Sequence, residues 1–331
     1  MHPRVIQVPP TGPGSNSTTF AARRRAWRAA VIPAMPPPRI ATSYGSPAPT
    51  VAAYSAGVSE TFAVTFLGTR DAAFGPGTFT SSQLVSLGET DVLVDAGTGS
   101  SSQLRRAGLS VPELEAIVLT HWHPDHVAGL PPLLRRGGGR LTQRSELRLF
   151  GPAPPSNAWW RLLRGASAWP LVASLDVVEP GDVLELGALR LEAFPTDHGA
   201  RSIGWRFHEA AGGDRVVVIP GDSRPSEDVQ GAARGADLLV FEATFLDEHR
   251  DRAVASRHST AWEAGSLARA AGCGTLALTH LSSRYARDEI EAEARLAFDR
   301  VLVPRDLDRL EIEPRAGRVH GPVTLHPAGA G

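Results

Sequence analysis

The chain has 331 residues, which is enough to bury a large core, and 42% of them are hydrophobic, as in an ordinary globular protein. The net charge is −1, but residues 1–59 hold six arginines and no acid, so the remainder carries −7 and is poorly suited to holding a polyanion over a large surface. No stretch approaches about 18 consecutive apolar residues, so we expect no membrane span, and the single cysteine excludes an internal disulfide.

Residues 1–58 are rich in Pro, Ala, Ser and Gly and show no periodic apolar face. This composition predicts a disordered tail that is dispensable for the fold. The segment RRRAWRAAVIPAM is interrupted by Arg28 and Pro33, so it is too short and too polar for a secretory signal, and we expect a cytoplasmic protein. An acid-free start rich in Arg, Ser and Ala is also typical of an organellar transit peptide, and that alternative stays open.

Residues 59–331 are expected to form one folded domain that begins with short strands. Strands are predicted at 61–69, 82–87 and 91–99, and the third ends in a Gly-rich turn after Asp95. Asp95 has two interpretations: it supports the loop that follows from behind, or it is a turn or cap carboxylate.

The stretch EAIVLTHWHPDHVAGL, residues 115–130, contains the densest group of potential metal ligands. A buried strand is predicted at 116–119, and a helix at 126–134. Between them, three imidazoles and a carboxylate fall within six residues: His121, His123, Asp125 and His126. Side chains at i and i+2 of a chain leaving a strand point the same way, so the first two histidines can bind one ion and the last two residues a second. Imidazole with carboxylate favours zinc or a similar divalent metal.

Polar residues of the same kinds follow later strands and loops. His198 lies in a loop bounded by Pro and Gly, where ligands are well placed. The apolar run before Asp222 predicts a buried strand, and a carboxylate at its end is costly unless it is paired or binds a cation. The strand predicted at 236–245 carries Glu242, while His258 precedes a capped helix and His280 follows an apolar strand and a threonine, as in the first motif. Further strands are predicted at 146–152, 174–178 and 183–194, and a further helix at 287–298.

The motif T-H-x-H-x-D-H after an apolar strand resembles the signature of the metallo-β-lactamase superfamily. Several segments resemble its ribonuclease Z branch: FLGT at 66–69, SSQLVSL at 81–87, VDAGTGSSSQLRRAGL at 94–109, GDSRP at 221–225, HST at 258–260 and THLSSRY at 279–285. The resemblance implies an α/β fold, an αβ/βα four-layer sandwich with the metals at one edge between two sheets.

The resemblance also implies a site for two Zn²⁺ ions, with Mn²⁺ or another divalent metal as the alternative. The implied ligands are His121, His123 and His198 for one ion, Asp125, His126 and His280 for the second, and Asp222 as the bridge. Asp125 would orient or deprotonate the nucleophile, and His258 would steady developing charge or protonate the leaving oxygen. The implied protein is a homodimeric hydrolase that cleaves phosphodiester bonds of RNA or of small phosphodiesters with a metal-bridging hydroxide.

Two departures from the ribonuclease Z pattern make tRNA binding doubtful. That family carries a basic tRNA-binding arm before its GD motif, where this chain has only HEAAGGDR at 208–215. Its P-x-K-x-R-N loop is replaced by DAAFGPGTFTSS at 71–82. The alternative is a small-molecule hydrolase of a lactone, an aryl sulfate or a cyclic phosphodiester, with no role in tRNA processing. Three tryptophans within 155–170 either line the cleft of such an enzyme or pack a short helix, and a metal-binding scaffold without catalysis is the third hypothesis.

Overall fold

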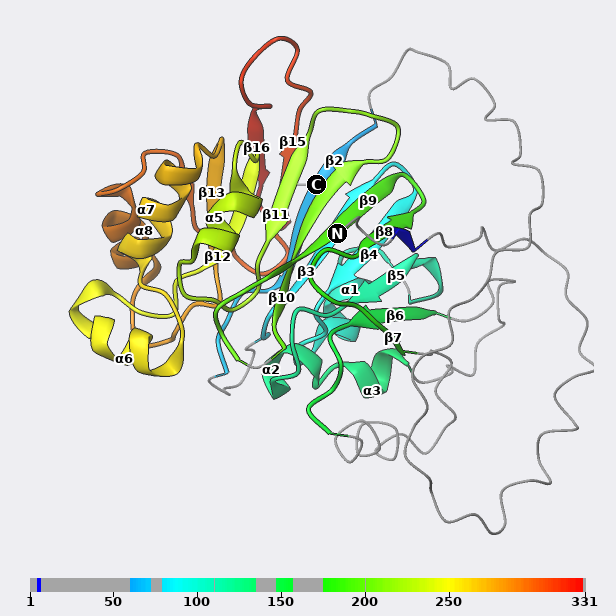
Figure 1. Ribbon diagram of the computed structural model, residues 1–331, viewed down its shortest axis with the longest axis horizontal. Coiled ribbons are helices and arrows are strands. Elements are labelled where there is room, and N and C mark those ends of the chain that lie inside the picture. The colour runs from blue at the N-terminus through cyan, green and yellow to red at the C-terminus, as the bar shows by residue number, and fades with distance from the viewer. Residues whose placement is uncertain are drawn as a thin grey trace, which may run out of the picture. The chain divides into compact units, whose positions relative to one another are not determined.

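The computed structural model describes residues 60–72, 79–109, 111–134, 147–156, 175–199 and 201–329, together with the backbone of a short strand at Val5–Ile6. In this part of the chain, two sheets of eight strands each face one another, and helices lie on their outer faces (Figure 1). The arrangement is the predicted αβ/βα four-layer sandwich.

Sheet A has the strand order β1-β8-β9-β10-β11-β12-β13-β14. Its strands are β1 (Val5–Ile6), β8 (Val183–Leu186), β9 (Leu189–Pro195), β10 (Ile203–Glu209), β11 (Val216–Ile219), β12 (Leu238–Glu242), β13 (Thr275–Thr279) and β14 (Val301–Leu302). The pairs from β8 to β11 are antiparallel, whereas β11 to β14 are parallel. Parallel strands end at the same edge of a sheet, so Asp222, Glu242 and His280, which end or follow β11, β12 and β13, meet there.

Sheet B has the order β16-β15-β2-β3-β4-β5-β6-β7. Its strands are β2 (Phe62–Gly68), β3 (Ser82–Leu87), β4 (Thr90–Val94), β5 (Ala116–Val118), β6 (Arg148–Gly151), β7 (Leu175–Val177), β15 (Arg309–Ile312) and β16 (Val323–His326). Strands β4 to β7 are parallel, which brings Asp95 and the loop with the first histidines to one edge.

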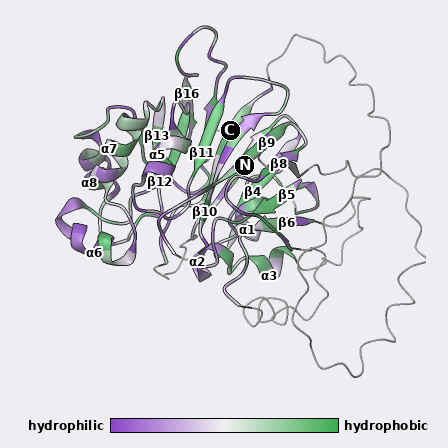
Figure 2. Cartoon of the chain, viewed as in Figure 1, coloured by the Kyte–Doolittle hydropathy of each residue, from purple (hydrophilic) through white to green (hydrophobic). Residues whose placement is uncertain are grey.

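Three apolar layers hold the sheets and helices together. Alternate residues of a strand point to opposite faces, so Val217 and Ile219 pack between the two sheets while Val216 and Val218 pack under helices. Figure 2 shows the strands mostly in the hydrophobic colour and helix α8 mostly in the hydrophilic colour. The helices over sheet A are α5 (Glu227–Ala233), α7 (Ala261–Ala271) and α8 (Arg287–Arg295), and those over sheet B are α1 (Ser100–Arg106), α2 (Pro124–Val127) and α3 (Leu130–Leu133).

Three shorter or peripheral helices complete the described elements: η2 (Val111–Glu113), η3 (Asp247–His249) and α6 (Arg250–Ser256). The sequence did not predict α1, α5 or α6. The capped helix predicted after His258 is α7: the Thr260 hydroxyl accepts a hydrogen bond from the backbone N–H of Glu263, and the Glu263 carboxylate accepts one from the backbone N–H of Thr260. No helix in the described part of the chain combines the length and the apolar character that crossing a bilayer requires.

The single helix predicted at 126–134 is wrong, because the chain forms α2 and α3 with a break at Gly129. A side chain at Gly129 would meet the Ser100 hydroxyl at 2.2 Å and the Gly97 carbonyl oxygen at 2.3 Å. The Gly129 N–H donates a hydrogen bond to the Ala96 carbonyl at 2.8 Å and not to α2, so the helix is interrupted where the backbone lies close to the turn before α1.

Several predictions concern residues that the structure does not describe. The interpretation of the tryptophans within 155–170 falls largely on them, as does the middle of the loop at 71–82. Of the tail predicted at residues 1–58, Val5–Ile6 forms β1 and pairs in parallel with Val183–Leu184 at the edge of sheet A. The rest of that tail lies outside the described residues.

Replacing Gly129 with alanine should lower the free energy of unfolding by about 1–3 kcal/mol, because the new methyl group overlaps two fixed oxygens. Gly231 is the matched control: it lies within α5, and a side chain there would meet nothing within 4 Å. Gly231→Ala should be neutral or stabilise the protein by up to about 1 kcal/mol. Urea unfolding of both variants checks this, and equal effects would contradict the close approach at Gly129.

Candidate metal centre

The loop after β5 carries the first group of polar residues into the space between the sheets. His121 and His123 lie in the extended chain that leaves the strand, and Pro124 occupies the first turn of α2. Helix α2 then places Asp125 and His126, both buried, on the same side. The Thr80 hydroxyl donates a hydrogen bond to the backbone carbonyl of Asp125 at 2.7 Å and holds this turn in place.

Sheet A supplies the second group from the ends of its strands. His198 follows β9, Asp222 follows β11, and His280 follows β13 with a positive φ of 55°. His258 lies between α6 and the cap of α7. All the residues that the sequence predicted for the site therefore meet at one edge of the sandwich.

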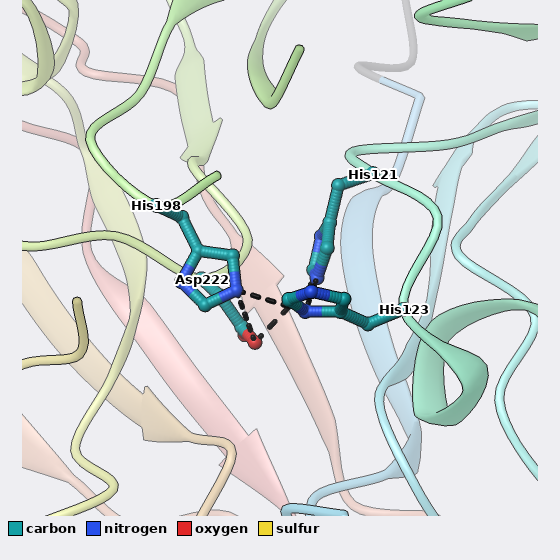
Figure 3. Close-up of side chains that lie close together, drawn as sticks. All are labelled: His121, His123, His198 and Asp222. Carbon is teal, nitrogen blue, oxygen red and sulfur yellow. Dashed lines mark hydrogen bonds and ion pairs between the residues drawn. The ribbon is translucent and has the colours of Figure 1, made fainter. Parts of the chain in front are cut away.

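The first cluster contains three histidines and Asp222, which converge from both sheets in Figure 3. His123 Nδ1 lies 3.0 Å from His121 Nε2 and 2.9 Å from His198 Nε2. The Oδ2 atom of Asp222 lies 3.7 Å and 3.8 Å from the same two Nε2 atoms. Four ligands about 2.0–2.1 Å from one tetrahedral zinc lie about 3.4 Å apart, so the cluster has the dimensions of a metal site.

The second cluster shares that carboxylate. Asp222 Oδ2 lies 3.3 Å from both His126 Nε2 and His280 Nε2. Asp125 Oδ2 lies 3.1 Å from His280 Nε2 and 3.6 Å from His126 Nε2. One oxygen of Asp222 is thus within reach of two separate groups of donors, which is the arrangement a bridging ligand requires.

Two buried atoms in these clusters lack a hydrogen-bond partner: His126 Nε2 and Asp222 Oδ1. A buried polar atom without a partner is destabilising, and a cation between the ligands would satisfy both. The donors are imidazole nitrogens and carboxylate oxygens without a thiolate, which suits zinc and related divalent metals. The residues therefore fit a site for two divalent ions.

Asp95 orients two of the histidines from behind. Its carboxylate accepts a hydrogen bond from His126 Nδ1 at 2.7 Å and another from the Thr120 hydroxyl at 2.7 Å. Since that hydroxyl donates to Asp95, it accepts from His121 Nδ1 at 3.0 Å. Both histidines are left with a free Nε2 that faces Asp222, so the interpretation of Asp95 as a support is correct.

Glu242 does the same on the other side of the site. Its carboxylate, which is fully buried, accepts from His258 Nδ1 at 2.9 Å and from the Thr244 hydroxyl at 2.6 Å. The Thr244 hydroxyl in turn accepts from His280 Nδ1 at 2.8 Å. From the sequence, neither Glu242 nor Thr244 had a predicted role in the site. The one signal available was their place at the end of a buried strand, which Asp95 and Thr120 share.

The backbone of Arg257 orients the remaining histidine. Its carbonyl accepts a hydrogen bond from His198 Nδ1 at 2.9 Å, which leaves His198 Nε2 for the cluster. This contact could not be predicted from the sequence, because every residue type has a backbone carbonyl.

The pKa values of the histidines and of Asp222 in the cluster depend on one another. Burial would raise the pKa of Asp222, but His280 and His126 outweigh it and hold that pKa well below its usual range. Burial would likewise lower the pKa of His126, but Asp222 and Asp95 raise it well above the ordinary value. Burial and the neighbouring His126 lower the pKa of His121. A metal that binds here therefore displaces protons from some of these histidines.

The chain is similar to known proteins over most of its described domain. The Beta-lactamase superfamily domain matches residues 90–281. A ribonuclease Z of Haloarcula marismortui is 33% identical over 290 residues, which cover 72% of this chain and 93% of that protein. A ribonuclease Z of Methanosarcina acetivorans is 30% identical over 262 residues, covering 64% and 85%. The short form of human tRNase Z has a similar crystal structure, with a TM-score of 0.60 and 25% identity over 75% of this chain and 98% of that one.

Replacing Asp222 with asparagine should reduce the metal content from two ions per chain to one or none, because the bridging charge is lost while the shape is kept. Asp228→Asn is the matched control, since Asp228 is an exposed carboxylate in the first turn of α5. Elemental analysis after dialysis gives the stoichiometry. Two retained metals in Asp222→Asn would show that this carboxylate does not bridge.

The metal-free protein should lose stability as the pH rises through about 9. Burial lowers the pKa of His258, but the charge of Glu242 and the hydrogen bond to it outweigh burial and raise that pKa to about 9, against 6.5 in the unfolded chain. A raised pKa stabilises fully below the unfolded value, and this contribution, at most about 3 kcal/mol, disappears above the folded value. The difference in unfolding free energy between the wild type and His258→Gln, measured with a chelator at pH 6, 8 and 10, should shrink accordingly; a constant difference contradicts the pairing.

Proposed function

The chain belongs to the beta-lactamase superfamily and, within it, to the ribonuclease Z branch, and from this premise we propose that its seven clustered ligands bind two zinc ions and cleave phosphodiester bonds in RNA or in a smaller ester. The chain is a metal-dependent hydrolase of phosphodiester bonds. The proposal adds the identity of the metal, the residues that bind it and the kind of substrate.

One observation carries the assignment of the ligands. A single oxygen of Asp222 lies within 3.3–3.8 Å of the Nε2 atoms of four histidines that come from both sheets. The hydrogen bonds behind these histidines leave each Nε2 available, so the whole arrangement is aimed at the space around that oxygen. Zinc is the ion that nitrogen-rich sites of this kind favour, and Mn²⁺ is the alternative.

Divalent metals at such a site supply Lewis acidity to phosphate oxygens and lower the pKa of an attacking water. Asp125 Oδ2 lies 3.1 Å from His280 Nε2 and 3.6 Å from His126 Nε2, so it borders the space in which the metals would lie. From there it is positioned to orient that water and to accept its proton. Glu242 accepts a hydrogen bond from His258 Nδ1 and thereby orients the ring, and in the metal-free chain it raises the pKa of His258 to about 9. His258 is therefore proposed to donate a proton to the leaving oxygen or to stabilise its developing charge.

Small phosphodiesters are included among the substrates because the connection between β10 and β11 is too short for the arm by which ribonuclease Z is expected to hold tRNA. Only residues 210–215 lie between β10 and β11, and they form a short turn. With the charge of −7 outside residues 1–59, few phosphates of a large RNA can be neutralised. The relatives named ribonuclease Z support RNA as a substrate; a homodimer and a cytoplasmic location remain predictions.

Replacing His258 with alanine should lower kcat by about 10²–10⁴ while both metals are retained, because an acid–base group is lost and no ligand is removed. His208→Ala is the control, since His208 lies on β10 and pairs with Glu192. Steady-state kinetics and elemental analysis on the same samples give both quantities. A loss of metal in His258→Ala would make His258 a ligand.

Turnover of four esters tests the function as a whole: bis(p-nitrophenyl) phosphate, precursor tRNA, an aryl sulfate and a lactone. We expect measurable hydrolysis of bis(p-nitrophenyl) phosphate, which needs only the metal centre and His258, and slow or absent maturation of the tRNA 3′ end. The salt dependence of tRNA binding should be shallow, because its slope scales with the number of phosphates contacted. Fast and accurate cleavage of precursor tRNA, or hydrolysis of the sulfate or the lactone alone, would contradict the proposal.

A further inference from the structure

Strained backbone conformations are concentrated at the metal centre. In the described part of the chain, the non-glycine residues with positive φ are Asp95, Arg201, Arg257, His280, Leu307 and Ala316. Such conformations cost free energy for residues with a Cβ atom and are retained where the surrounding structure or the function requires them. Asp95 and His280 serve the metal centre, whereas the two arginines, which flank the segments with His198 and His258, have no function yet.

Arg257 is in direct contact with the centre. It ends helix α6 in the left-handed conformation with φ 57°, immediately before His258, and its carbonyl holds His198. A glycine would adopt this conformation without strain and offer the same carbonyl. The side chain of Arg257 is exposed, and its Nη1 lies 3.5 Å from the Oδ1 atom of Asp197, the residue before His198. The chain thus keeps a long cation at a position where the backbone alone would favour glycine.

Arg224 brings a second guanidinium to the same place. It lies two residues after Asp222, and its backbone pairs with Asp197 in an antiparallel bridge whose N–H···O distance is 3.0 Å. Directly opposed residues of an antiparallel pair project their side chains to the same face, with Cβ atoms about 5 Å apart. The Nε atom of Arg224 is buried without a hydrogen-bond partner, and none of the ion pairs found among the described residues includes Arg224. Two arginines therefore neighbour Asp197 beside the His198 half of the centre: Arg257 through an ion pair, and Arg224 through the backbone bridge.

We propose that Arg257 and Arg224 form a subsite for a second phosphate of the substrate, next to the phosphate that is cleaved. The inference rests on the proposed function, since it names the substrate class of the same centre: nucleotide esters with at least two phosphates. The guanidinium fork matches a phosphate with two parallel hydrogen bonds. The exposed ion pair of Arg257 with Asp197 is weak, so Arg257 can exchange it for a phosphate of the ligand.

Binding to the metal-loaded protein tests the subsite without turnover. Adenosine 3′,5′-bisphosphate and adenosine 5′-monophosphate are phosphate monoesters, so a phosphodiesterase leaves them intact during calorimetry. The wild type should bind the bisphosphate about 10-fold or more tightly than the monophosphate, because charge-assisted hydrogen bonds of this kind are strong. Arg257→Gly should reduce this ratio to within about 3-fold and lower the salt dependence of bisphosphate binding by about one phosphate contact.

Three further variants make the test specific. Arg257→Gly suits the left-handed position, so the fold and the metal content should persist, and elemental analysis checks the latter. Arg257→Lys should give an intermediate ratio of bisphosphate to monophosphate affinity, and Arg224→Gln should also lower this ratio. Arg252 is an exposed arginine on α6, so Arg252→Ala is the control and should leave the ratio unchanged. Equal affinities in the wild type, an unchanged ratio in Arg257→Gly, or an equal fall in Arg252→Ala would overturn the subsite. Failure of the wild type to cleave bis(p-nitrophenyl) phosphate would instead contradict the proposed function, because that ester has a single phosphate.

Discussion

A carboxylate buried among histidines needs a compensating positive charge, and Asp222 is such a carboxylate. It is 2% exposed, and one of its oxygens has no hydrogen-bond partner while the other faces four imidazoles. Protons on the histidines compensate this charge only in part and only over a limited pH range, whereas divalent cations satisfy the orphaned atoms directly. The ligands come from both sheets, so the apolar core that packs the sheets against each other also has to bring these side chains together.

Two buried carboxylates, Asp95 and Glu242, make the arrangement rigid in the same way on opposite sides. Each follows or ends a buried strand, binds one histidine directly and orients a second through a threonine hydroxyl. The two carboxylates differ in their direct partners: Asp95 holds a proposed metal ligand, while Glu242 holds His258 and raises its pKa. The same device therefore orients proposed metal ligands on both sheets, and on sheet A it also orients His258.

The surroundings of the centre bear on the size of the substrate that it can hold. The connection between β10 and β11 is a turn of six residues, so the chain has no arm there to hold a distant part of a large RNA. Positive charge is instead found close to the centre, in Arg257 and Arg224. The proposed subsite would therefore contact only the phosphate next to the one that is cleaved, and not the many phosphates of an extended polyanion.

The cluster from His121 to His126 is visible in the sequence alone, because the spacing of side chains after a strand is a local property of the chain. The fold class and the full set of proposed ligands followed from the resemblance of several such segments to a known family, and the fold is confirmed. The sequence also predicted most strands, since buried runs such as 216–219 are apolar on both faces. It could not decide between the two roles of Asp95, foresee the break at Gly129, or reveal that Glu242, Thr244 and the Arg257 carbonyl orient histidines. Those contacts join residues distant in the chain, and some involve backbone atoms that every residue has, so only the tertiary structure determined them.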